Sequence, residues 1–179
     1  KVTTAKYPYS TAGISYYFDG TGDYLATAEN TGLWYLGTGD FTIEAWVYPT
    51  ARVTNGAYIV ARSQYGVGTD WVLQILNAGT LQFYMLTGGA GNIVTSTGTV
   101  SLNAWTFVTV VRSGTTVKLY INGTNDGTLS SFTSALTTTY GPTVIGNSSN
   151  NAGTTYFNGY MSDFRITRGT ALYLSNFIP

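Results

Sequence analysis

The clearest strand pattern in the sequence is Phe41-Thr42-Ile43-Glu44-Ala45-Trp46-Val47-Tyr48. Apolar residues occupy every second position along it, and successive side chains of a β-strand point to opposite faces of the sheet. One face therefore carries Phe41, Ile43, Ala45 and Val47, and the other carries Thr42, Glu44, Trp46 and Tyr48. The first face is typical of a hydrophobic core, and the second is amphipathic.

Similar segments recur along the chain. They are short, rich in β-branched and aromatic residues, and bounded by Gly, Asn, Asp or Pro. The predicted strands are Ser15–Phe18, Phe41–Tyr48, Ala57–Ala61, Trp71–Leu76, Leu81–Leu86, Trp105–Arg112, Val117–Ile121, Thr143–Ile145 and Tyr156–Ile166. No stretch sustains apolar residues at helical spacing over three turns. We therefore predict an all-β sandwich or jelly roll.

Turn residues predict how these strands are connected. Ser113-Gly114 and Asn77-Ala78-Gly79 each separate two predicted strands, and Asn122-Gly123 follows the strand that ends at Ile121. Small residues and Gly supply the positive φ angles that return an antiparallel strand. The tail 169–179 is too apolar for a free linker, and we expect it to pack onto the sandwich.

Composition excludes several classes of function. The 179 residues contain 8 Lys+Arg, 8 Asp+Glu, no His and no Cys, and 9% of them are charged. A Ser-His-Asp triad, a thiol nucleophile and a conventional zinc site are excluded. The formal net charge of zero gives no sign of the basic surface that binding to nucleic-acid phosphates requires. We expect one domain spanning residues 1–179.

The chain also lacks the pattern of a membrane protein. Its longest apolar stretches, such as Trp71–Leu76, are far shorter than the roughly 20 residues that span a bilayer, and its start shows no signal pattern. We expect no membrane insertion. Because the chain begins with Lys1, we expect it to be a processed or excised piece of a longer protein.

An ordered set of motifs carries a family resemblance from Tyr17 to Pro179. The motifs are Tyr17-Phe18-Asp19-Gly20 with Asp23-Tyr24-Leu25, Phe41–Val47, Trp105–Val108, Leu119–Gly123, Ile145-Gly146 and Phe157–Ile166. In this order they resemble the laminin G-like branch of the concanavalin A-like lectin/glucanase superfamily. The closing segment 168–173 is similar to copies of this domain in phage virion proteins, bacterial adhesins and glycan-active enzymes.

The resemblance implies a fold and a class of function. The fold is a two-sheet antiparallel jelly roll, and the usual function is a binding module at an extracellular location or a virion surface. Fold alone does not determine function, so the site must be argued from residues. The implied partners are a glycan or another cell-surface ligand, this chain itself, or other subunits of a fibre or virion.

The catalytic pattern of the glucanase members is missing. Those enzymes carry two Glu bracketing an Asp at alternating strand positions, whereas the only Glu residues here are Glu29 and Glu44. Asp40 and Glu44 share a face but lie about 13 Å apart along a strand, and glycosidase pairs need about 5 to 9.5 Å. We expect no enzyme, with a divergent hydrolase built from carboxylates of different strands as the less favoured alternative. The favoured interpretation of Glu44 is a strand carboxylate that bonds neighbouring hydroxyls or is exposed.

A calcium ion is a possible cofactor at two places. The resemblance implies a ligand at Asp70, completed by a backbone carbonyl near Thr87 and a side chain near Thr138. Thr138 departs from the family's Asp or Asn, and one carboxylate with hydroxyls and carbonyls implies weak binding at best.

A structural calcium site formed by Asp19, Asp23 and Asp163 is the second possibility. The first two flank the turn 20–22, and the third lies in the last long strand. The simpler interpretation is favoured: ordinary Asp-Gly turn chemistry, and a surface pair of Asp163 with Arg165.

Carbohydrate binding uses aromatic rings for stacking and Asn, Asp, Thr and backbone groups for hydroxyls. Loops of this chain supply such residues, and the predicted ligand-binding set is Trp34, Tyr35, Tyr65, Trp71, Asn147, Asn150 and Asn151. We assign Trp46, Trp105, Phe83 and Phe107, which lie inside strand patterns, to core packing. The predicted function is a non-catalytic module for recognition or adhesion that binds carbohydrate. The alternative is a structural virion or surface-fibre module for protein assembly, which low surface charge favours.

Overall fold

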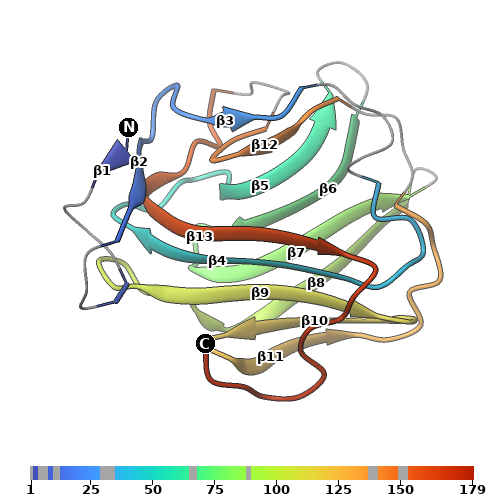
Figure 1. Cartoon of the computed structure of the whole chain (residues 1–179). Helices are drawn as coiled ribbons and strands as arrows, with labels where there is room; N and C mark the ends of the chain where they lie inside the picture. The colour runs from blue at the N-terminus through green and yellow to red at the C-terminus, as the bar shows by residue number, and fades with distance from the viewer. Residues whose placement is uncertain are drawn as a thin grey trace.

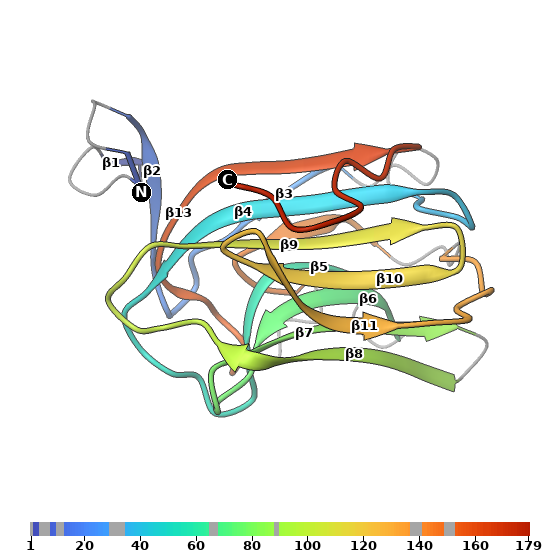
Figure 2. The ribbon, with the colours of Figure 1, turned by 90° about the horizontal axis from the view of Figure 1, so that it is seen from below.

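Two antiparallel β-sheets face each other in the computed structural model of the protein (Figure 1 and Figure 2). The structure describes residues 2–3, 8–9, 13–28, 35–64, 68–87, 90–136, 141–148 and 153–179, and these residues include no helix. None of them therefore forms a helix long and apolar enough to cross a membrane. The described residues form the predicted jelly-roll sandwich.

Seven strands form one sheet and six form the other. The order in the seven-stranded sheet is β1 (Val2–Thr3), β2 (Ser15–Asp19), β13 (Asn158–Arg168), β4 (Phe41–Pro49), β9 (Thr106–Ser113), β10 (Thr116–Ile121) and β11 (Thr124–Leu129). The order in the six-stranded sheet is β3 (Leu25–Ala26), β12 (Thr143–Ile145), β5 (Ala57–Gln64), β6 (Gly68–Ile75), β7 (Thr80–Thr87) and β8 (Ala90–Thr99).

The hydrophobic core lies between the two sheets. β4 is central to the seven-stranded sheet, and its residues Phe41, Ile43, Ala45 and Val47 are all 0% exposed. The ring of Phe41 contacts the ring of Phe83 on β7 of the other sheet, with 5.9 Å between their centroids. The alternation along β4 therefore predicted the buried face correctly.

The predicted turns form as expected. Asn122 and Gly123 have φ angles of 49° and 76°, the pair of positive values that a two-residue hairpin turn requires. This turn joins β10 to β11 in antiparallel register. Gly79, with φ of 93°, ends the turn between β6 and β7, and its N–H donates a hydrogen bond to the Leu76 carbonyl.

The tail 169–179 crosses the outer face of the seven-stranded sheet, as predicted (Figure 1). Phe177 N–H donates to the Gly123 carbonyl at 2.9 Å, and its ring stacks on Tyr173 with centroids 3.6 Å apart. The Tyr120 hydroxyl and the Lys118 ammonium donate to carbonyls of the tail. The tail is thus fixed along its length and becomes a wall on that face.

Every predicted strand exists, with ends that differ by up to three residues. Four strands were missed: the two-residue β1 and β3, and the polar edge strands β8 and β11. β11 reads Thr-Asn-Asp-Gly-Thr-Leu, and none of its residues is fully buried. An edge strand with so little buried surface needs few apolar residues, which explains the missing signal.

Candidate functional site

The outer face of the seven-stranded sheet carries a cluster of aromatic rings. Trp46 on β4 lies between Phe107 on β9 and Tyr9, with ring centroids 5.3 Å and 5.7 Å away. The indole N–H of Trp46 donates a hydrogen bond of 2.9 Å to the Tyr9 hydroxyl. Phe107 is buried, with Phe177 of the tail 6.1 Å from it. Trp46 is only half-buried, so part of its ring system reaches solvent.

A hollow of about 490 Å³ lies beside Trp46 on this face. Strands β4, β9 and β13 supply its floor, and Tyr9 and the tail supply its walls. We call it the sheet-face hollow, and its lining residues are Tyr9, Glu44, Trp46, Phe107, Asp163, Phe164, Arg165, Tyr173, Ile178 and Pro179. Its volume falls in the range of about 300 to 1,000 Å³ that is usual for small-molecule sites.

A β-bulge in β13 shapes the floor of the hollow. Ser162 pairs with Trp46, but the next pair along the strands is Arg165 with Glu44, so β13 has one extra residue. Strict alternation from Ser162 would place Phe164 opposite Glu44. The bulge instead turns Arg165 toward the outer face, which is the re-aiming that bulges commonly perform.

An ion pair and a phenol provide the polar groups of the hollow. Glu44 is nearly buried and forms an ion pair with Arg165, whose side chain is 55% exposed. Desolvation acts to lower the pKa of Arg165, but the hydrogen bond and charge of Glu44 raise it above its ordinary value. Burial, followed by the charge of Glu44, raises the pKa of Tyr173. Near pH 7 the hollow therefore presents a guanidinium cation and a neutral phenol.

A second hollow, of about 370 Å³, lies among the loops at one end of the strands. It is lined by Gly20, Ala51, Arg52, Val53, Thr54, Asn55, Gly153, Thr154, Tyr156 and Asn158. Its polar groups suit hydroxyl ligands, but Tyr156 is the only aromatic side chain among the described residues that line it. The sheet-face hollow offers a larger aromatic platform beside charged groups, and we take it as the candidate site.

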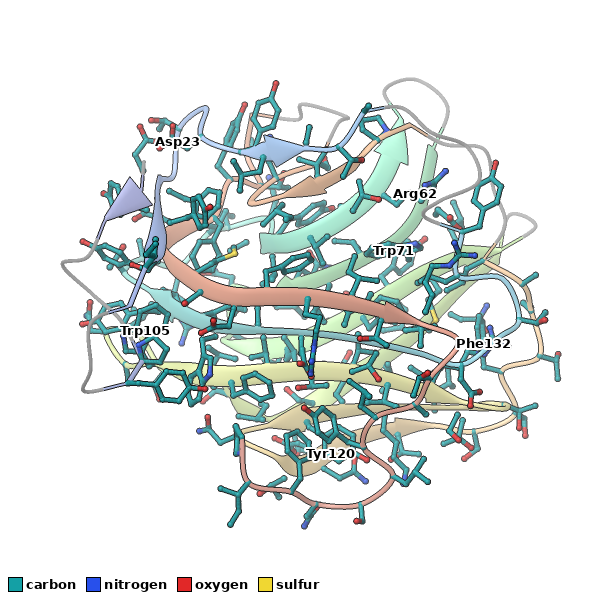
Figure 3. All side chains as sticks on the ribbon, in the orientation of Figure 1. Asp23, Arg62, Trp71, Trp105, Tyr120 and Phe132 are labelled. Atoms are coloured by element: carbon teal, nitrogen blue, oxygen red, sulfur yellow. The ribbon has the colours of Figure 1, made fainter. Side chains whose placement is uncertain are left out.

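The predicted ligand-binding residues do not form one site among the described residues. Trp71 is 0% exposed and packs in the core 6.1 Å from Phe83 (Figure 3). Asn147 is 1% exposed and accepts a hydrogen bond of 2.7 Å from the Thr155 hydroxyl. Neither side chain can stack on or bond a ligand in this arrangement. The predicted positions Trp34, Tyr65, Asn150 and Asn151 lie outside the described residues.

The assignment of four strand aromatics to core packing was correct for the two that are buried, Phe83 and Phe107. Phe83 is in the core between the sheets. Phe107 is buried on the opposite face, beneath the tail. Trp46 and Trp105 are half-buried, and Trp105 packs against Tyr48, 5.5 Å between centroids. Sequence alone could not show that the tail and Tyr9 turn the outer face into a second aromatic layer.

Asp70 has a buried cation beside it. Arg62 lies on β5 and Asp70 on the neighbouring β6, and 3.5 Å separate the Arg62 Nε and an Asp70 carboxylate oxygen. Both side chains are almost completely buried, and the guanidinium lies 4.8 Å from the ring centre of Tyr35. Desolvation lowers the pKa of Arg62, an effect that Asp70 and Tyr35 partly offset. Tyr35, predicted as a ligand contact, therefore packs on this buried pair.

Calcium does not fit the described part of this site. The ion needs several oxygens with enough negative charge to offset its dehydration, and the one carboxylate already balances a guanidinium. Thr138 lies outside the described residues, as does the side chain of Thr87.

Calcium removal tests this conclusion directly. We expect the thermal midpoint of the protein to be the same, within about 1 °C, in millimolar calcium and in EDTA, because a ligand stabilises only a state that binds it. Differential scanning calorimetry measures the midpoint. A calcium-dependent rise of several degrees that disappears in Asp70→Asn would show that the carboxylate binds the ion.

The three carboxylates of the other predicted calcium site do not come together. Asp19 and Asp23 lie in one turn, where Asp23 accepts a bond from the Asp19 N–H at 3.3 Å. Asp19 pairs with Asn158, five residues before Asp163 on β13. The described residues contain no group of three acidic side chains that could hold a metal ion. Arg165 forms its ion pair with Glu44 and not with Asp163, so the predicted surface pair was also wrong.

The carboxylates of Asp40 and Glu44 are each bound by a partner within the fold. Asp40 accepts a hydrogen bond of 2.7 Å from the Gly114 N–H in the turn between β9 and β10. Glu44 was expected to bond hydroxyls or to be exposed, but its partner is Arg165 and it is 4% exposed. Neither acid is presented openly to a ligand in the sheet-face hollow.

The chain matches a known family model and is similar to several solved structures. A family model described as the concanavalin A-like lectin/glucanases superfamily matches residues 19–172. Domain 4 of the extracellular arabinanase AbnA from Geobacillus stearothermophilus, solved with arabinotriose, has a TM-score of 0.68 at 15% identity, covering 89% of this chain and 72% of that one. The sialidase module CBM40 from Ruminococcus gnavus, solved with α2,3-sialyllactose, has a TM-score of 0.66 at 16% identity, covering 75% and 78%.

Another similar structure is an animal protein. The mouse laminin α1 chain, domains LG4-5, has a TM-score of 0.64 at 15% identity, covering 90% of this chain and 44% of that one. No curated protein matches this chain by sequence. At these identities the structural similarities establish the fold alone.

Proposed function

The chain belongs to the concanavalin A-like lectin/glucanases superfamily, and from this premise we propose that it is a non-catalytic carbohydrate-binding module whose site is the sheet-face hollow. One observation carries the proposal: the partly exposed Trp46 lies in a ligand-sized hollow beside an ion pair and a phenol. Sugar rings stack on aromatic faces while their hydroxyls bond polar groups placed around them.

The groups in the hollow match the chemistry of a saccharide. Arg165 is more than half exposed and has donors beyond those that face Glu44. The exposed Asp163 carboxylate lines the same hollow and can accept hydroxyl protons. Two of the similar structures, the arabinanase domain and the sialidase module, were solved with bound saccharides, which supports the same class of ligand here.

We propose no hydrolysis, because the acids near the hollow are unsuited to it. A glycosidase needs one carboxyl group to donate a proton and a second to act as nucleophile or base. Glu44 is nearly buried and paired with Arg165, which leaves Asp163 as the only exposed acidic side chain among the described residues of the lining. Measurable release of reducing sugar by the pure protein would overturn the non-catalytic assignment.

A glycan array followed by isothermal titration calorimetry tests the proposed function. Binding to at least one class of glycan, unchanged by EDTA, is expected. No binding to any glycan on a broad array would reject the proposal. Because glycans are displayed on cell and virion surfaces, we further propose that the module acts outside the cell or on a virion.

Assembly is a second candidate function, and an apolar edge of the sandwich favours it. Ile14, Tyr16 and Leu25 are 58%, 41% and 43% exposed and line a hollow of about 380 Å³ between the two sheets. A surface of this kind suits a second copy of the chain or another fibre subunit. The two functions are compatible, because repeated display of a weak site raises avidity.

This candidate predicts oligomers that depend on the apolar edge. Light scattering at high protein concentration should give a mass above 19.2 kDa for the wild type. Leu25→Asp should restore the monomer, because a buried unpaired carboxylate is costly in an interface. Leu174→Asp is the matched control, since Leu174 is 63% exposed but lies away from this edge. A wild type that is monomeric throughout would remove assembly through this edge.

A further inference from the structure

The β13 bulge places an unusual residue in the sheet-face hollow. Asp163 lies in the extra stretch between Ser162 and Arg165, and its backbone φ is 51°. Left-handed backbone is unfavourable for most side chains, and Asp and Asn are among the few that tolerate it. Backbone strain of this kind concentrates at binding sites. The bulge thus places Asp163, in a conformation that few residues could adopt, where it lines both the sheet-face hollow and the hollow at the apolar edge.

The charges that line the hollow do not balance. Two of its residues are acidic, Glu44 and Asp163, and one is basic, Arg165. Arg165 forms its ion pair with Glu44, so these two charges cancel. Asp163 is exposed and accepts a hydrogen bond of 3.0 Å from the neutral Ser162 hydroxyl, which leaves its charge in place. Among the described side chains that line the hollow, Asp163 therefore carries the one charge that no opposite charge balances.

We propose that Asp163 makes the hollow selective for neutral carbohydrates over acidic ones, an inference that rests on the proposed function. A neutral sugar can donate a hydroxyl to the carboxylate in a charge-assisted hydrogen bond. A sialic acid, uronic acid or sulfated sugar brings a second anion beside Asp163, and like charges in a shared site repel. Arg165 still offers donors to a ligand, but its positive charge is balanced by Glu44, so it adds little net attraction for an acidic sugar.

The test compares neutral glycans with acidic counterparts of the same backbone. An array is printed with neutral oligosaccharides and their sialylated, uronate-bearing and sulfated forms, and is probed at low and high salt. We expect the wild type to bind the neutral form at least about five-fold more tightly, the scale of one close charge repulsion through water. High salt should reduce that ratio because salt screens exposed charges.

Two variants of Asp163 test whether its carboxylate causes the preference for neutral glycans. Asp163→Asn keeps the side-chain shape and tolerates positive φ, and it should bring the neutral-to-acidic ratio below about two-fold. Asp163→Gly removes the side chain at a positive φ angle that Gly adopts freely, and it should lower the neutral-to-acidic ratio to the same level. Asp23→Asn is the control, because it removes the same charge outside the hollow and should leave the ratio unchanged (Figure 3).

The outcomes separate this inference from the proposed function. A wild type that prefers acidic glycans, or a ratio that Asp163→Asn and Asp163→Gly leave unchanged, overturns the inference while carbohydrate binding stands. A wild type that binds no glycan on the array overturns both. A ratio that falls in both Asp163 variants and not in Asp23→Asn supports both.

Discussion

Trp46→Ala will weaken carbohydrate binding at least about 30-fold, the loss expected when a central aromatic contact worth about 2 kcal/mol is removed. The indole is the largest ring that lines the sheet-face hollow, and it also holds the Tyr9 wall through a hydrogen bond. Alanine removes both the stacking surface and that bond. Isothermal titration calorimetry with the tightest ligand from the glycan array measures the effect.

Trp105→Ala is the matched control for Trp46→Ala. Trp105 is also half-buried and packs on an aromatic partner, Tyr48, but it does not line the hollow. We expect its dissociation constant to stay within about two-fold of wild type, since it removes no contact to the ligand. Equal losses in the two variants would mean that the effect comes from general destabilisation. Full affinity in Trp46→Ala would remove the hollow as the site.

Arg112→Met will lower the free energy of unfolding by about 3 kcal/mol or more, because one buried and three partly buried hydrogen bonds to carbonyls would be lost. Arg112 is 1% exposed, and its guanidinium donates to the carbonyls of Gly37, Gly114, Phe132 and Ser134 at 3.0 to 3.2 Å. The group also lies over the Phe132 ring, 4.7 Å from its centre (Figure 3). The Gly37 carbonyl also accepts a hydrogen bond from the Leu136 N–H, so it keeps a partner in the variant. In a domain of this size the thermal midpoint should fall by about 10 °C.

Chemical denaturation and calorimetry measure this loss. Arg168→Met is the control, because Arg168 is exposed at the end of β13 and surface changes usually stay within about 0.5 kcal/mol. A loss below about 1 kcal/mol in Arg112→Met would show that the four carbonyls find water or other donors when the guanidinium is removed.

The predictable part of the fold depends on local patterns. Alternation in 41–48 predicted which side chains of β4 face the core, and Asn122-Gly123 predicted a hairpin turn, because both depend on neighbouring residues alone. β8 and β11 were missed because edge strands bury few side chains and can be built from Ser, Thr, Asn and Gly. The burial of Arg62 and Arg112 was also missed, because a local pattern does not show that Arg62 pairs with Asp70 across two strands or that Arg112 reaches the carbonyls of residues 37, 132 and 134.

The candidate site was less predictable than the fold. The alternation of apolar and polar residues placed Trp46 and Glu44 on the amphipathic face of the strand. Nothing in the β4 sequence shows that Tyr9 and the tail pack beside that face. The bulge that brings Arg165 opposite Glu44 has no Gly to mark it, because Asp163 itself adopts the positive φ. The apolar residues of the tail were the one sequence feature that bore on the site. They predicted that the tail packs onto the sandwich, but not which side chains it would lie beside.

One measurement tests the proposed site most directly: an amide and indole NMR titration of the ¹⁵N-labelled protein with the tightest glycan. The chain has 4 Trp residues, at positions 34, 46, 71 and 105, so the indole signals form a small and assignable set. We expect the Trp46 indole signal to move in proportion to binding while those of Trp71 and Trp105 stay in place. Movement of the Trp34 signal with Trp46 unchanged would contradict this expectation and place the ligand in a loop instead.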